Sequence, residues 1–266
     1  MRMYLNAALF ALLASTLLVG VARADGDAVY LDVAGTLEVA PDGSVHDYTL
    51  ETELDPDVAA LVDSTLRGWK FEPVLVEGKP VTATTRMLLE LEAVPHDDGY
   101  GLRVSDLVLG TPDPVDLPPP AYPREALRND IGAQVSMVLD VDADGSVRDV
   151  HVEQVSLSGG PGKRADFYRE RFADAVRKTA LQWSYAMGEH VDGGPVAGRF
   201  RVPVTFEPGG SGDWVERQEY VPGPYHPSPW ADANRSTPGA ESLDNGVAQP
   251  LAPQVKLSED VIGTEL

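Results

Sequence analysis

The five histidines are the first candidates for chemistry, because imidazole serves both as a metal ligand and as a general acid or base. They are scattered along the chain, at His46, His96, His151, His190 and His226. No two of them have the spacing of an H-x-x-x-H or H-E-x-x-H motif, which would direct two ring nitrogens at one ion. The sequence therefore predicts no metal site, and we expect His46 and His151 to be ordinary strand residues.

Nucleophiles and phosphate-binding loops are the next candidates. Residues 159–164 read Gly-Gly-Pro-Gly-Lys-Arg, but Leu157 stands where a phosphate-binding loop has its first glycine and Arg164 where it has Ser or Thr. We interpret this segment as an ordinary loop. The chain contains no cysteine and no G-x-S-x-G motif, so it offers neither a thiol nor a nucleophilic serine on a strained turn. We expect a protein that is not an enzyme and that holds no small-molecule cofactor.

Carboxylates are abundant but form no catalytic pattern. Asp140, Asp142 and Asp144 alternate before a turn, where they could attract Ca²⁺, yet the following residues lack EF-hand spacing and a solvated turn is favoured. No carboxylate pair stands out for acid–base catalysis. The chain as a whole carries 42 Asp and Glu against 21 Lys and Arg, a net charge of -21. Without a concentrated positive face, binding to nucleic acid or to an anionic membrane is excluded.

The strands and helices predicted from the sequence form two similar copies. Apolar residues alternate with polar ones in each copy, a period typical of a strand with one buried face. The matching segments are 42–45 with 144–147, 69–71 with 183–185, and 86–92 with 201–207. The first pair reads Asp-Gly-Ser-Val in both copies, 102 positions apart. Each copy is therefore predicted to run strand, hairpin, strand, helix, strand.

A helix is predicted in each copy from apolar residues at helical spacing. In the first copy, Asp55 is a candidate N-cap and Pro56 takes the first helical position. In the second, the helix runs from about Phe167 to Trp183. The second copy also has a short opening helix at 122–128.

The N-terminus has the pattern of an export signal. Residues 7–22 form a run of 16 mostly apolar residues, and Ala22-Arg23-Ala24 follows with small residues at the cleavage positions. We expect cleavage after Ala24 and a periplasmic location. The alternative is an uncleaved inner-membrane anchor, although the run is shorter than the roughly 20 residues that cross a bilayer.

These observations predict an α+β protein of two modules, each a three-stranded antiparallel sheet packed by helix. The expected segments are a signal peptide at 1–24, a degenerate module at 25–94, a linker at 95–117, a second module at 118–207, and a tail at 208–266. The tail is acidic and rich in Pro and Gly, with no sustained hydrophobic period. It is therefore predicted to be largely disordered, while its aromatics Trp214, Tyr220, Tyr225 and Trp230 could pack back on a module or form a docking motif.

The second copy resembles the C-terminal domain of the TonB energy-transducer family. The motifs that carry the resemblance are Tyr-Pro-x-x-Ala at 122–126, Asp-Gly-x-Val at 144–147, Trp-x-aromatic at 183–185 and Val-Pro-Val-x-Phe at 202–206. The first copy is similar, without the opening helix. The resemblance implies binding to the TonB-box peptide of outer-membrane transporters, by pairing at the edge of the final strand. The family's membrane helix and Pro-Lys spacer are not expected here, so energy transduction by this chain alone is not expected either.

The resemblance places the partner-binding site on the final strand and beside it. The predicted site residues are Tyr122, Pro123, Arg199, Phe200, Arg201, Val202, Pro203 and Val204. Inward side chains are expected to be core, which leaves the edge backbone and the outward Arg199 and Arg201, unless these two arginines form an ordinary solvated face. The expected partner is an outer-membrane TonB-dependent transporter or another envelope protein. The alternative is a self-associating scaffold, including a homodimer, whose own edges pair.

Overall fold

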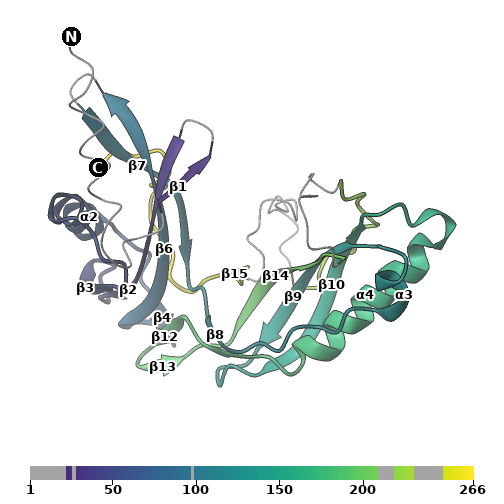
Figure 1. Ribbon diagram of the computed structural model, residues 1–266. Coiled ribbons are helices and arrows are strands. Elements are labelled where there is room, and N and C mark those ends of the chain that lie inside the picture. The colour runs from purple at the N-terminus through teal and green to yellow at the C-terminus, as the bar shows by residue number, and fades with distance from the viewer. Residues whose placement is uncertain (1–21, 26–27, 97–98, 209–218, 231–247) are drawn as a thin grey trace, which may run out of the picture. The chain divides into compact units, whose positions relative to one another are not determined.

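The computed structural model describes residues 22–25, 28–96, 99–208, 219–230 and 248–266 (Figure 1). Residues 1–21 of the expected signal peptide lie outside this part, and the expected cleavage site after Ala24 falls inside strand β1 (Ala22–Asp25). The chain divides into two compact units. Unit 1 comprises Met1–Gly110, Glu189–Gly194 and Gln254–Leu266, and unit 2 comprises Thr111–Gly188 and Pro195–Pro253.

Unit 1 is built on one antiparallel sheet. Its strands and helix in chain order are β1, β2 (Ala28–Val39), β3 (Val45–Leu50), α2 (Pro56–Gly68), the small hairpin of β4 (Leu75–Val76) and β5 (Lys79–Pro80), β6 (Ala83–His96), β7 (Gly99–Leu109) and β12 (Glu189–Val191). β2 lies between β3 and β6, while β7 and β12 pair with β6 on its other side. The short β13 (Gly194–Pro195) follows β12 in the same sheet.

Helix α2 begins as the sequence predicts. The Asp55 carboxylate accepts a hydrogen bond from the Asp57 backbone N–H (3.0 Å), and Pro56 occupies the first turn, where a missing N–H costs nothing. Val62 and Leu66 are fully buried in the core that also contains Leu37 and Met87 of the sheet. The apolar side of the helix is thus the side that covers the sheet.

Unit 2 contains a second antiparallel sheet. Its elements are β8 (Asp113–Asp116), α3 (Arg124–Leu127), β9 (Ala133–Val141), β10 (Val147–Leu157), α4 (Ala165–Ala180), β11 (Ser184–Ala186), β14 (Gly198–Phe206) and β15 (Gln249–Pro250). The order in the sheet is β10-β9-β14-β15. Helix α4 covers one face of this sheet (Figure 1), where Phe172 and Val176 are fully buried.

The repeated Asp-Gly-Ser-Val turn docks in the same way in both units. In unit 2 the Tyr185 N–H donates to the Gly145 carbonyl (3.0 Å), and in unit 1 the Phe71 N–H donates to the Gly43 carbonyl (2.8 Å). Both glycines have positive φ, at 84° and 80°. A Cβ on Gly145 would lie 1.8 Å from the Tyr185 oxygen, and one on Gly43 would lie 2.0 Å from the Phe71 oxygen. Glycine is therefore required at both positions by conformation and by close approach.

Three sequence expectations are corrected by the structure. Residues 95–117 are not a linker, because β7 pairs with β6 from the Met87–Leu109 pair to the His96–Gly99 pair. The sheets have more than three strands, since β1, β7 and β12 extend one and β15 extends the other. The tail is not disordered throughout, because Ala248 and Val255 are buried in the two cores.

Candidate functional site

The candidate site is strand β14, whose two faces have different roles. Phe206 points to the helical face, with its ring centroid 4.8 Å from that of Phe172 and 5.5 Å from that of Tyr122. Phe200 and Val202 belong to the same buried cluster. These side chains are core, as the sequence predicts, and Val204 packs partly buried against them. The alternate residues Arg199 and Arg201 therefore face the other side of the sheet.

The outer edge of β14 is already occupied over part of its length. Strand β15 runs antiparallel to it, with Phe200 opposite Pro250 and Arg201 opposite Gln249. The Leu251 N–H donates to the Arg199 carbonyl at 2.9 Å. The expectation of an open edge is therefore wrong at Arg199–Arg201, because a segment of the tail supplies the neighbouring strand.

The contact of Leu251 with Arg199 also fixes which backbone groups face outward. Successive residues of a strand direct their N–H and C=O groups to opposite sides, so Arg199, Arg201 and Pro203 point away from β9. Pro203 lacks an N–H, and its ring fits here because the missing donor faces outward rather than toward Ser136 of β9. This edge therefore offers a carbonyl but no donor at Pro203.

Arg201 is not an exposed residue, which corrects the expectation of an outward, accessible side chain. Its guanidinium donates to the Glu153 carboxylate, with Nε 2.7 Å from Oε2 and Nη2 3.1 Å from Oε1. Glu153 is fully buried and Arg201 is 7% exposed. Burial alone would raise the pKa of Glu153, but the hydrogen bonds and charge of Arg201 outweigh it and hold this pKa below its ordinary value of 4.5.

A segment of the tail completes the surroundings of this buried ion pair. The Tyr225 hydroxyl donates to Glu153 Oε1 at 3.1 Å, and the Ser228 backbone N–H lies 3.5 Å from the same oxygen. Nearby, Val221 and Leu157 of β10 exchange two backbone hydrogen bonds of 2.8 and 3.0 Å. The tail therefore lines the outer side of β10 as well as the outer side of β14.

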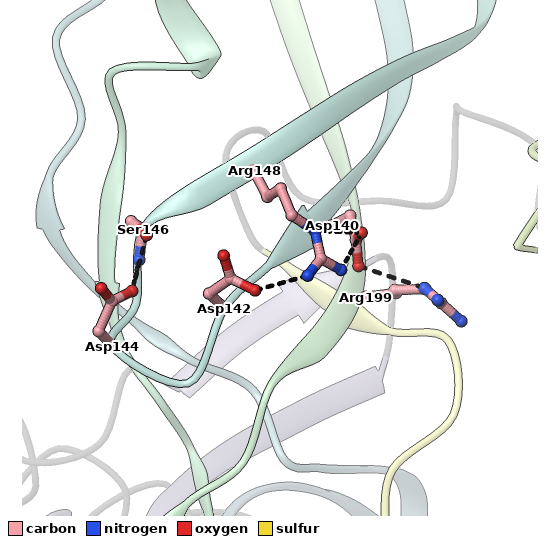
Figure 2. A network of polar contacts seen from close by, with 6 residues as sticks. All are labelled: Asp140, Asp142, Asp144, Ser146, Arg148 and Arg199. Atoms are coloured by element: carbon pink, nitrogen blue, oxygen red, sulfur yellow. Dashed lines mark hydrogen bonds and ion pairs between the residues drawn. The ribbon is translucent and has the colours of Figure 1, made fainter.

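Arg199 belongs to a second, more exposed network (Figure 2). Asp140 lies between two arginines and accepts hydrogen bonds from Nε of Arg148 (3.0 Å) and Nε of Arg199 (3.3 Å). Arg148 also donates to Asp142 at 2.8 Å. The Arg199 guanidinium carbon lies 5.8 Å from the centre of the Trp230 ring, a cation–π distance.

The three alternating aspartates do not converge on one point. Asp144 accepts from the side chain (2.6 Å) and the backbone N–H (3.0 Å) of Ser146, and the side-chain bond is the main cause of its lowered pKa. Asp140 and Asp142 are instead paired with arginine, as Figure 2 shows. Across the described residues, no group of three His, Asp or Glu side chains is placed to hold a metal ion.

Tyr122 and Pro123 have structural roles next to β14. The Tyr122 ring packs edge-on against both Phe172 and Phe206, and its hydroxyl donates to the Ile131 carbonyl at 2.9 Å. Burial raises the pKa of Tyr122 to about 12. Pro123 precedes helix α3 as its N-cap residue. Together they anchor the opening helix to the core below β14.

Sequence reasoning missed Glu153 and strand β15, whereas it left open that Tyr225 and Trp230 pack back on a module. Glu153 lies at a register irregularity of β10, between the Val152–Met137 and Gln154–Ser136 pairs, and its carboxylate meets Arg201 on the face of the sheet away from α4. A single acid inside the valine-rich run 150–155 is the sequence pattern that marks it. Strand β15 has two residues, one of them proline, which is too short for periodicity to reveal.

Comparisons with known proteins can now be set beside this geometry. No protein-family model matches the chain. The protein TonB of two strains of Xanthomonas campestris pv. campestris is 38% identical to it over 88 residues, which cover 33% of this chain and 34% of the relative. The chain therefore spans about a third of the length of these curated relatives. The similarity supports a TonB-like C-terminal domain. Within the described residues, no helix is long and apolar enough to span a membrane.

Proposed function

We propose that this chain is a non-enzymatic envelope protein of TonB-linked transport, and that it binds an extended segment of a partner at the outer edge of β14. The observation that carries the proposal is the hydrogen bond from Leu251 N–H to the Arg199 carbonyl, since it makes β14 an edge to which a strand is added. The similarity to TonB supplies the transport context. The resemblance makes the N-terminal peptide of an outer-membrane transporter the expected partner.

The chemistry around β14 supports binding rather than catalysis. Arg201 and Glu153 are held by each other, and Asp140 is held by two arginines. Such closed ion pairs shape a surface and leave no polarised group directed at a substrate. Backbone groups on the edge are then the means of recognition, and they place little demand on the partner's side chains.

A site-specific crosslink tests the proposal, because the chain contains no natural cysteine. Arg199→Cys places a photo-crosslinker on the exposed end of the edge, whereas Arg201 is buried and unsuited. Lys178→Cys, exposed near the end of α4, is the matched control. We expect the label at 199, but not at 178, to capture an outer-membrane transporter in cells that export the protein. Capture of only this protein, or of nothing, at 199 would contradict transporter binding and favour a self-associating scaffold.

We further propose that the two units contain copies of one ancestral module. Both have the order strand, turn, strand, helix, strand, with the first strand in the middle, as β3-β2-β6 and β10-β9-β14. The docking of Gly43 on Phe71 and of Gly145 on Tyr185 supports this origin, since it involves corresponding residues. Superposition of the two sets in an experimental structure tests it. A helix crossing the opposite face in one unit would contradict it.

We also propose that the protein is exported and cleaved after Ala24. The apolar run and the Ala-x-Ala pattern support this, and the residues removed would include three of the four that form β1. Intact-mass analysis of protein recovered from the periplasm tests it, with a chain starting at Asp25 as the expected product. Recovery of the uncleaved chain in the inner membrane would instead support an anchor.

A further inference from the structure

We propose that residues 248–251 act as an internal ligand, which fills the edge of β14 and which a partner strand must displace in order to bind. The inference rests on the proposed function and adds its regulation. It starts from the geometry of the contact, which is that of strand addition: antiparallel direction, Gln249 opposite Arg201, and Leu251 N–H donating to the Arg199 carbonyl.

Several features predict that the internal strand pairs only weakly with β14. It has two residues, against nine for β14. Pro250 cannot donate a hydrogen bond, and Pro253 follows closely and discourages extension of the pairing. Of the residues 248–251, Ala248 alone is buried, while the others are half-exposed. A segment that paired with more of the nine β14 residues would form more backbone bonds than this two-residue strand does, although Pro203, beyond Arg201, is buried in the free chain.

The same register determines which partner segments can pair with the edge of β14. Because Leu251 directs its N–H toward β14, Gln249 does so too, whereas Pro250 faces away. A competing segment must therefore supply N–H groups opposite Arg199 and Arg201, so proline is excluded there. Proline is tolerated opposite Phe200, as Pro250 shows. The partner is an extended, antiparallel peptide with this alternation, and the edge selects it by backbone donors rather than by side-chain charge.

A variant of the full chain tests the inference. Gln249→Pro removes an N–H that faces β14, and Gln249→Ala keeps it, so the pair isolates the backbone bond. The probe is a fluorescent synthetic peptide with the sequence of residues 246–253. If the internal strand fills the edge nine-tenths of the time, its loss should tighten peptide binding about tenfold. We expect this gain for Gln249→Pro only, and no binding of a peptide that carries the same proline.

Amide hydrogen exchange in the unmodified chain gives a second measurement that needs no variant. The Leu251 N–H of the internal strand donates to the Arg199 carbonyl of β14, while the Val202 N–H faces β9 inside the sheet. The Leu251 amide should exchange faster, at a rate that low concentrations of denaturant do not change, because local opening exposes it. The Val202 amide should exchange by global unfolding. Equal protection of the two amides, or unchanged peptide affinity in a folded Gln249→Pro variant, would overturn the inference.

The outcomes separate this inference from the proposed function. Peptide binding released by Gln249→Pro, without capture of a transporter at position 199 even in that variant, would keep the internal ligand and reject the transporter partner. Equal capture of a transporter by the Gln249→Pro and Gln249→Ala chains would keep the partner and reject displacement.

Discussion

Two tyrosines of unit 2 show how differently one hydroxyl group can contribute to stability. Tyr122 donates its hydroxyl hydrogen to the Ile131 carbonyl. The Tyr185 hydroxyl is buried without a hydrogen-bond partner among the described residues. Burial raises the pKa of both phenols, because the phenolate is poorly solvated there. Phe71, which occupies the corresponding place in unit 1, has no hydroxyl to satisfy.

Replacing each tyrosine with phenylalanine should therefore have opposite effects. Tyr185→Phe removes an unsatisfied group and should raise the free energy of unfolding, by about 1–2 kcal/mol. Tyr122→Phe removes a hydrogen bond that the folded chain forms, and it should lower the free energy of unfolding by about 0.5–1.5 kcal/mol. Urea denaturation of the two variants and the parent chain gives both values. A loss of stability in Tyr185→Phe would mean that its hydroxyl has a partner, such as an ordered water.

The ion pair of Glu153 and Arg201 is another single-residue feature with a measurable consequence. Glu153→Ala leaves the Arg201 guanidinium buried without its carboxylate, which should cost about 3–5 kcal/mol at pH 7. Glu170→Ala, on the exposed side of α4, is the control and should change stability by less than about 0.5 kcal/mol. Denaturant unfolding measures both.

The stability difference between the parent chain and Glu153→Ala should also depend on pH, in a direction that the lowered pKa of Glu153 determines. The pKa of Glu153 is lower in the folded chain than its ordinary value of 4.5, so the stabilisation is complete above that value. It is lost as the pH falls through the lowered folded pKa. The stability difference between parent and Glu153→Ala should therefore shrink below about pH 4. A difference that stays constant down to pH 3 would contradict the charge of Glu153 as its source.

At the scale of elements, the sequence predicts what periodicity and turn chemistry determine. Apolar and polar residues alternate along β2, β6 and β14, Asp55 and Pro56 begin α2, and the two Asp-Gly turns lie where expected. The family resemblance predicts a binding edge on β14, which stays a prediction, and the part of it at Arg199–Arg201 is occupied by β15. What could not be predicted depends on long-range contact, because Ala248–Leu251 has no periodicity and is held by pairing with a distant strand. Burial of Arg201 likewise depends on a long-range contact, its ion pair with Glu153 of β10.

Pro203 is buried, so its missing N–H bears on stability rather than on access to the edge of β14. Pro203→Val supplies an outward N–H where the strand has only a carbonyl, and a buried donor without an acceptor should lower the free energy of unfolding by about 1–3 kcal/mol. Pro208→Val, which lies beyond the end of β14 at Phe206, is the control and should change it by less than about 0.5 kcal/mol. Urea denaturation gives both values, and an unchanged stability of Pro203→Val would show that the new donor finds an acceptor.

At the scale of the whole molecule, the last residues of the chain complete a core that begins near the start. Val255 is fully buried among residues of unit 1, and Leu257, Val261 and Leu266 pack against the same cluster. The Glu72 N–H donates to the Lys256 carbonyl, and the Leu266 N–H donates to the Leu102 carbonyl. Unit 1 therefore cannot reach its full set of contacts until the C-terminus has been synthesised.

Truncating Val255 tests this dependence of unit 1 on the C-terminus. Val255→Ala removes two methyl groups from a fully buried side chain and should lower the free energy of unfolding by about 1.5–3 kcal/mol. Ile262→Ala, at a side chain that is 48% exposed in the same segment, is the matched control and should cost well under half as much. Denaturant unfolding followed by Trp69 fluorescence, with the other three tryptophans replaced by phenylalanine in every variant, reports on unit 1, because Trp69 belongs to the same core. Equal, small effects of the two substitutions would mean that the C-terminal segment only covers the surface of unit 1, and that residues 28–110 supply its core without it.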